Sequence, residues 1–170
     1  AHQTNVDVSN RFVVFNVRDL GDQLRQIALI IVFDFIWNRM IQNKNSGVRT
    51  YCYCDEIHVM FQSYYSANFL KQLYKRGRKY GMCITGLTQN VEDLLRSEQA
   101  RGMISNSDFI MMLNQSSEDL KILAGMLNIS ETQMGYVTGA DAGSGLLFAE
   151  KVIVPFVDRF PETSYLYKLL

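Results

Sequence analysis

A short uncharged run, Thr50 to Cys54, ends abruptly in two adjacent carboxylates, Asp55 and Glu56. The run is typical of a buried strand, so both acids are expected at its tip. Because neighbouring side chains of a strand point to opposite faces, the two carboxylates should share the tip but point in different directions. Such a pair suits phosphoryl transfer, in which one acid holds Mg²⁺ and the other orients the attacking water. The alternative is an acidic pair that simply caps the next helix.

Segments of strand character alternate with segments of helical character along the chain. Strands are predicted over 11–17, 50–55, 82–87 and 108–113. A long helix should begin within 19–22 and run to residue 42, and a second should span 61–80. The apolar residues that follow helical spacing in the first helix are Leu24, Ile27, Ala28, Ile31 and Phe35. This alternation predicts an α/β fold, with a mostly parallel sheet that is covered by helices.

Local signals fix several element ends. Gly81 follows the basic cluster 75–79 and is expected to end the second helix. Ser116 should cap a helix that runs to Met126, and Ser130 should open another short helix. Two strands, 146–150 and 151–156, have so little between them that they predict a tight hairpin. The 170 residues are enough for one well-buried core, so a single domain over 1–170 is expected.

Composition indicates which partners and which cellular compartment suit the protein. The 17 basic and 17 acidic side chains balance, so any nucleic-acid or membrane contact must depend on a local surface. The three cysteines, Cys52, Cys54 and Cys83, lack metal-ligand spacing and lie in apolar runs, which predicts reduced core thiols of a cytosolic protein. The longest apolar run, 27–33, is too short to span a bilayer, so a soluble chain is expected.

Polar residues also follow the third predicted strand. Thr88 and Gln89 come directly after it, and ligands of parallel sheets bind outside the carboxyl ends of the strands. Gln89 therefore suits contact with a γ-phosphate, although a simple polar turn is the alternative. Arg78 lies before the same strand, about 20 Å from Gln89 at roughly 3.3 Å per residue. Arg78 would thus act on a neighbouring subunit's site, or else be a solvated cation at a helix end.

The order of these motifs resembles the back half of a conjugation motor ATPase. The similarity is to the VirB-four/TraE-like ATPases of type IV secretion, which are relatives of coupling proteins and of the FtsK–HerA pumps. It extends over nearly the whole chain. The collinear motifs that carry it are Thr4-Asn5-Val6-Asp7, Arg11-Phe12-Val13-Val14-Phe15, Arg18-Asp19-Leu20, Asp55-Glu56, Gly77-Arg78-Lys79-Tyr80-Gly81, Gly86-Leu87-Thr88-Gln89-Asn90, Asn106-Ser107-Asp108 and Gly145-Leu146-Leu147.

The resemblance implies a RecA-like P-loop fold that binds ATP and Mg²⁺ between subunits of a homo-oligomer, a hexamer or a dimer. It implies that Asp55 holds Mg²⁺ through water, Glu56 activates the attacking water, and Arg78 is an intersubunit arginine. Nucleotide contacts are implied for Gln89, Thr88 and Gly145. The implied partners are other type IV secretion components and DNA. The implied location is cytoplasmic, at the inner face of the cell membrane, with peripheral attachment through those partners.

One departure from the family pattern is that no Gly-x-x-x-x-Gly-Lys-Ser/Thr loop occurs in the sequence. In the family this loop lies upstream, so the chain is expected to be a carboxyl-terminal portion that is inactive alone. Two other functions stay open. Asp55-Glu56-Ile57-His58 also spells the DExH box of helicases, although Gly86-Leu87-Thr88 replaces the motif expected after the next strand. The other alternative is an oligomerisation or scaffold module of a secretion complex that does not hydrolyse ATP.

Overall fold

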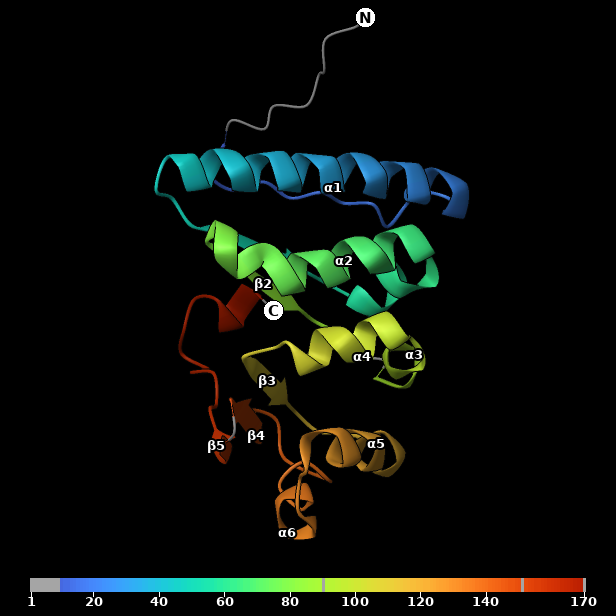
Figure 1. The fold of residues 1–170 in the computed structure, drawn as a ribbon. Helices are drawn as coiled ribbons and strands as arrows, with labels where there is room; N and C mark the ends of the chain where they lie inside the picture. The colour runs from blue at the N-terminus through green and yellow to red at the C-terminus, as the bar shows by residue number, and fades with distance from the viewer. Residues whose placement is uncertain (1–9, 90, 151, 170) are drawn as a thin grey trace, which may run out of the picture. The chain divides into compact units, whose positions relative to one another are not determined.

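The computed structural model describes residues 10–89, 91–150 and 152–169. The motif Thr4-Asn5-Val6-Asp7, Asn90 and Lys151 therefore lie outside the described residues. The chain divides into two compact units, residues 1–87 and 88–170. Each unit mixes helices with strands, as the α/β prediction requires, and each is described by itself (Figure 1).

The first unit contains the predicted acidic strand and its neighbour. Strands β1 and β2 pair in parallel, from Thr50 opposite Met82 to Cys54 opposite Gly86, which confirms the expected pairing. The elements of this unit are α1 (Asp22–Asn45), β1 (Thr50–Cys54), η1 (Ile57–Gln62), α2 (Tyr64–Arg76), η2 (Gly77–Tyr80) and β2 (Met82–Gly86).

Helix α1 is confirmed, but the apolar residues that follow helical spacing are not the ones that it buries. Leu24, Ile27 and Ile31 are exposed, and the buried residues are Leu29, Phe33 and Met40. The reason is that α1 has apolar side chains on more than one side, so its spacing cannot decide which side packs. The side that packs is set by contacts with α2 and β2. Phe33 stacks on Phe69 of α2 with ring centroids 4.2 Å apart, and Met40 joins a core cluster with Leu73 of α2 and Met82 of β2.

The segment 11–17 is not a strand, which corrects the prediction. It forms no strand ladder and runs extended along α1 (Figure 1). The apolar side chains of this segment pack on the helix instead. The Phe15 and Phe35 rings meet edge-on, with their centroids 5.2 Å apart. A strand needs a neighbouring strand to satisfy its backbone, and the neighbour of this segment is a helix.

The predicted helix 61–80 is interrupted. Ser63 is extended, with φ −111° and ψ 131°, and its carbonyl accepts the Ala67 N–H, so α2 begins only at Tyr64. The last turn then tightens into η2, which ends at Gly81. Gly81 has φ 68°, the left-handed conformation expected of the glycine that ends a helix.

The second unit contains an antiparallel sheet of order β3-β4-β5. The hairpin β4-β5 is confirmed, and Ser116 and Ser130 cap α5 and α6 as predicted. Strand β3 does not join a parallel sheet, because its backbone is paired with β4, from Phe109 opposite Ala149 to Met112 opposite Leu146. The elements are α3 (Val91–Arg96), α4 (Glu98–Ser105), β3 (Phe109–Met112), α5 (Ser117–Leu127), α6 (Glu131–Met134), β4 (Ser144–Ala149), β5 (Val152–Val157) and η3 (Tyr167–Leu169).

All three cysteines are free thiols, but they are not all core residues. Cys54 is buried and Cys52 is half-buried, whereas Cys83 is exposed. Cys83 pairs with Tyr51 across the sheet, and Tyr51 is exposed as well. The strand pleat therefore places Cys83 on the open face and the other two thiols on the covered face.

Candidate functional site

The acidic pair lies in a turn that is held to the end of β2. Asp55 and Glu56 follow Cys54 directly. The Leu87 N–H donates to the Cys54 carbonyl at 2.9 Å, and the Ile57 N–H donates to the Leu87 carbonyl at 2.8 Å. The backbone of Leu87 thus holds the turn on both sides, at the carboxyl end of the parallel pair.

Glu56 has an unusual backbone conformation for a residue with a side chain. Its φ of 45° and ψ of 49° are left-handed, which costs about 1–3 kcal/mol for such a residue. The Glu56 N–H donates to Oδ1 of Asp55 at 3.0 Å, so the two acids are joined within the turn. Strained residues of this kind are common at functional sites, where the surrounding structure holds them in place.

The two carboxylates have different surroundings. Asp55 is exposed, whereas Oε2 of Glu56 is buried and, among the described residues, accepts no hydrogen bond. Nδ1 of His58 lies 3.2 Å from this oxygen, close enough for an ion pair when the imidazole is protonated. A buried acceptor without a donor suits a ligand that brings its own hydrogen, such as water. His58 had no predicted role outside the helicase alternative, although it lies only two residues from Glu56.

A compact layer of side chains lies behind the turn. At Gly86, a β-carbon would lie 2.6 Å from Cδ1 of Ile57 and 3.0 Å from the Tyr74 hydroxyl, so a side chain there would have to displace Ile57. Burial raises the pKa of Tyr74, which keeps the phenol neutral. Tyr74 could not be predicted from the sequence, because only the fold brings this α2 residue to the end of β2.

Two thiols lie on the strand that leads into the turn. The Sγ atoms of Cys52 and Cys54 are 3.8 Å apart. Their hydrogen bond lowers the pKa of Cys52 and raises the pKa of Cys54, and burial raises the pKa of Cys54 further. Cys54 is therefore a neutral thiol in this arrangement.

Arg78 lies far from the acidic turn of its own chain. It is exposed and belongs to η2, just before the amino end of β2. The acidic turn lies at the carboxyl end, and the five residues of β2 span roughly 16 Å at about 3.3 Å per residue. The structure therefore does not bring Arg78 together with Asp55 and Glu56.

The other predicted site residues belong to the second unit. Thr88 is half-buried and Gln89 is exposed at its start, and Gly145 is buried in β4. That these residues gather with Asp55 stays a prediction. The presence of glycine at position 145 has a structural explanation, because a β-carbon there would lie 2.1 Å from the Met112 carbonyl oxygen.

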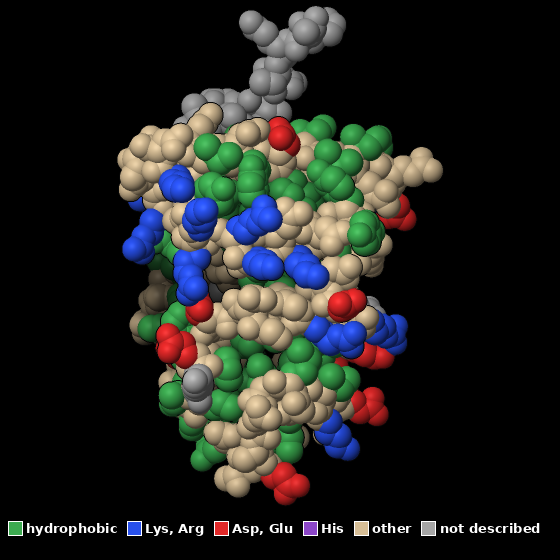
Figure 2. Space-filling model, viewed as in Figure 1, with side chains coloured by type: hydrophobic (Ala, Val, Ile, Leu, Met, Phe, Trp, Pro, Cys, Tyr) green, Lys and Arg blue, Asp and Glu red, His purple; other side chains and the backbone are tan. Residues whose placement is uncertain are grey.

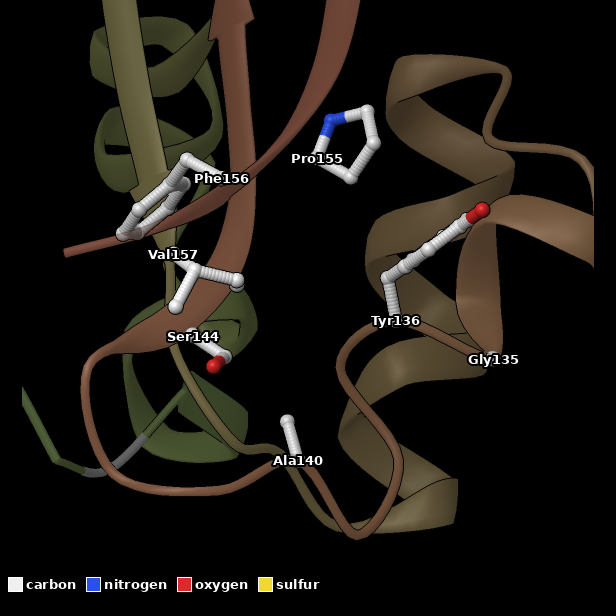
Figure 3. Close-up of a pocket in the computed structure, with 8 residues that line it drawn as sticks. Gly135, Tyr136, Ala140, Ser144, Pro155, Phe156 and Val157 are labelled. Atoms are coloured by element: carbon white, nitrogen blue, oxygen red, sulfur yellow. The ribbon is translucent and has the colours of Figure 1, made fainter.

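A pocket of about 450 Å³ opens beside Gly145 in the second unit. Figure 3 shows Tyr136 on one side of it and Val157 on the other, with Ala140 between them at the lower edge. Its lining is mainly apolar and carries no charged side chain among the described residues.

Positive side chains gather over α2 of the first unit, as Figure 2 shows. No Asp or Glu occurs between residues 57 and 91, so no acid of that segment offsets them. The exposed cations of α2 and η2 are Lys71, Lys75, Arg76, Arg78 and Lys79. The chain is neutral as a whole but has a local positive surface.

No described helix has both the length and the apolar character that crossing a bilayer requires. No group of three or more His, Cys, Asp or Glu side chains within the described ranges is arranged to hold a metal ion. Mg²⁺ needs no such group, because it usually binds one or two carboxylates and completes its shell with water and phosphate.

The chain is similar to known proteins in both sequence and fold. Residues 1–143 match the model of a family described as the TraG P-loop domain. The fold matches the structure of VirB4 of Thermoanaerobacter pseudethanolicus with a TM-score of 0.78 and 25% sequence identity, over 93% of this chain and 44% of that one. The chain thus spans less than half the length of that protein. No curated protein has a matching sequence.

Proposed function

Since this chain belongs to the TraG P-loop domain family, we propose that it forms part of an ATP-hydrolysing motor of a conjugative type IV secretion system. The observation that carries the proposal is the strained acidic turn at the carboxyl end of a parallel strand pair, within a segment that matches this family. The similarity to VirB4 supports the same assignment. The work of the motor would be pilus assembly or the transfer of DNA or protein.

The residues of the turn fit separate roles in ATP hydrolysis. Asp55 is exposed and would hold Mg²⁺ through water, and the ion would neutralise phosphate charge when bound. Glu56 would orient the attacking water and accept its proton through its carboxylate, which lies next to Asp55 at the end of the parallel strand pair. Gln89 would sense the γ-phosphate, and Thr88 and Gly145 would contact the nucleotide. His58 would hold the Glu56 carboxylate in position.

Arg78 would complete the site of a neighbouring subunit. Its position at the opposite end of β2 from the acidic turn supports action in trans rather than within its own chain. An arginine supplied in this way stabilises transition-state charge and accelerates phosphoryl transfer by about 10³–10⁵-fold. The protein would then work as a homo-oligomer, a hexamer or a dimer, with ATP bound between subunits.

Further partners follow from the same assignment. Other secretion components would hold the motor at the inner, cytoplasmic face of the cell membrane. DNA is a candidate partner, because the exposed cations of α2 and η2 form a positive surface that suits phosphate contacts.

A scaffold that keeps the fold without hydrolysis is the second candidate. One sequence observation favours it, namely that the phosphate-binding Gly-x-x-x-x-Gly-Lys-Ser/Thr loop does not occur in these 170 residues.

The test uses a protein in which this chain is joined to a phosphate-binding loop. Arg78→Ala should leave ATP binding nearly intact and lower kcat by about 10³-fold or more, because the lost contact belongs to the transition state. Lys79→Ala is the matched control, since Lys79 is the adjacent exposed cation of η2, and it should keep most of the activity.

Mixing two inactive variants then separates action in trans from action within one chain. Arg78→Ala subunits combined with Glu56→Gln subunits should regain activity, because some junctions pair an intact Glu56 with an intact Arg78. If the subunits demonstrably mix and no activity returns, Arg78 does not act between subunits. If the loop-joined protein without any substitution hydrolyses no ATP at all, the scaffold is supported instead.

A further inference from the structure

We propose that Cys52 and Cys54 are a modification site, an oxidisable thiol pair that closes into a reversible disulfide within strand β1. The two sulfur atoms already lie 3.8 Å apart and face each other in a hydrogen bond. Both thiols are free, so the reduced form is the one the structure describes. The proposal concerns the chemistry of the strand and does not depend on the proposed function.

The geometry permits the bond but strains it. Residues two apart on a strand share a face, and their Cα atoms lie about 6.6 Å apart at roughly 3.3 Å per residue. Disulfides usually have Cα separations of about 4.4–6.8 Å, most often near 5.5–6 Å, with the sulfur atoms about 2.05 Å apart. Bond formation would therefore shorten this part of β1. Strained disulfides are easily reduced, which makes the modification reversible.

The surroundings fix the pairing and the order of the steps. Cys52 is half-buried and Cys54 is buried, so an oxidant from solvent reaches Cys52 first. Cys83 lies on the opposite face of the sheet, because it pairs with Tyr51 whereas Cys52 pairs with Ile84. In the described strands, the thiol next to Cys52 is therefore that of Cys54 and not that of Cys83.

A hydroperoxide is the class of oxidant that balances the reaction. The Cys52 sulfur attacks one peroxide oxygen, the O–O bond breaks, and the products are a sulfenic acid and water when the oxidant is hydrogen peroxide. The Cys54 sulfur then gives up its proton and attacks the Cys52 sulfur, the S–O bond breaks, and the departing hydroxide takes up that proton to leave as a second water. Two thiols lose two electrons in total, and one peroxide gains them.

The bond would act on the acidic turn through the backbone. The Cys54 carbonyl accepts from Leu87 N–H at 2.9 Å, and the Leu87 carbonyl accepts from Ile57 N–H at 2.8 Å. A shortened β1 cannot keep both contacts at their present lengths, since Leu87 is fixed to the end of β2. The turn that carries Asp55 and Glu56 would shift or loosen.

The test treats the full chain with hydrogen peroxide, removes the excess with catalase, and alkylates the unfolded protein before peptide mass spectrometry. In Cys83→Ser protein, both remaining thiols should escape alkylation and the peptide that contains them should lose two hydrogen masses. A dithiol reductant should restore both. In wild type the same peptide should lose two hydrogen masses without involving Cys83, whereas Cys52→Ser and Cys54→Ser should show no intramolecular bond. Amide hydrogen exchange at Leu87 and Ile57 should become faster in the oxidised protein.

Three outcomes would overturn the inference. The first is that Cys83→Ser protein keeps both thiols free under conditions that fully oxidise a model dithiol. The second is sulfinic or sulfonic acid at Cys52 with Cys54 still free. The third, a disulfide that leaves exchange at Leu87 and Ile57 unchanged, overturns the coupling to the acidic turn.

Discussion

At the scale of single residues, Gly145 shows how a glycine can have two explanations. The family resemblance implies a nucleotide contact, whereas the structure shows that β4 has no room for a β-carbon at this position. Such an atom would lie 2.1 Å from the Met112 carbonyl oxygen and 3.1 Å from the Phe156 ring. The strand pairing alone therefore requires glycine here, whether or not a nucleotide binds nearby.

A pair of glycine substitutions tests this explanation. Gly145→Ala should lower the free energy of unfolding by about 1–3 kcal/mol or more, because β3 and β4 must move apart. Gly125→Ala is the control: Gly125 lies in α5 and a β-carbon there meets nothing within 4 Å, so alanine should stabilise the helix by about 0.5–1 kcal/mol. Urea unfolding of both variants measures the difference. Equal stability of the two would contradict the steric explanation.

At the scale of elements, α1 is a helix whose packing its own sequence leaves undecided. It spans 24 residues with apolar side chains on several sides. Phe33 is 2% exposed and stacks on Phe69, whereas Ile31, two residues earlier, is 65% exposed. The choice between these sides depends on Phe69 and Leu73 of α2 and on Met82 of β2, and not on the spacing within α1.

Two substitutions in α1 distinguish its sides. Phe33→Ala should lower the free energy of unfolding by about 3–5 kcal/mol, because it leaves a cavity against Phe69. Ile31→Ala should change it by less than about 0.5 kcal/mol, because the side chain loses little burial and alanine favours the helix. Thermal or urea unfolding gives both values. A larger loss from Ile31→Ala would show that this side of α1 is covered in the protein.

At the scale of the whole molecule, the elements expected for one nucleotide site are divided between two compact units. Asp55, Glu56 and Arg78 belong to the first, and Thr88, Gln89 and Gly145 belong to the second. Catalysis of phosphoryl transfer depends mostly on positioning and on neutralising charge, for which P-loop proteins use a glycine-rich loop and its lysine.

The chain by itself is therefore expected to show no meaningful ATP hydrolysis and only weak ATP binding. Phosphate release by highly purified protein measures turnover, and Glu56→Gln protein gives the background. Robust turnover that Glu56→Gln abolishes would show that these residues form a complete site without the loop.

The sequence by itself determined the features that depend on neighbouring residues. Gly81 ends its helix because only glycine adopts φ 68° without strain, and Ser116 and Ser130 cap helices because their hydroxyls reach N–H groups three residues on. The strand before the acidic turn and the C-terminal hairpin were predictable for the same reason, since period-two patterning and short connections are local.

Only the tertiary structure decided which partner each element takes. Residues 11–17 alternate like a strand but lie on α1, and β3 pairs with β4 although its sequence equally suits a parallel neighbour. The proximity of His58 to Glu56 and of Tyr74 to Gly86 also required the fold. Hydrogen-bond ladders and packing faces are completed by residues distant in the chain, and no local pattern specifies which of several suitable partners will reach them.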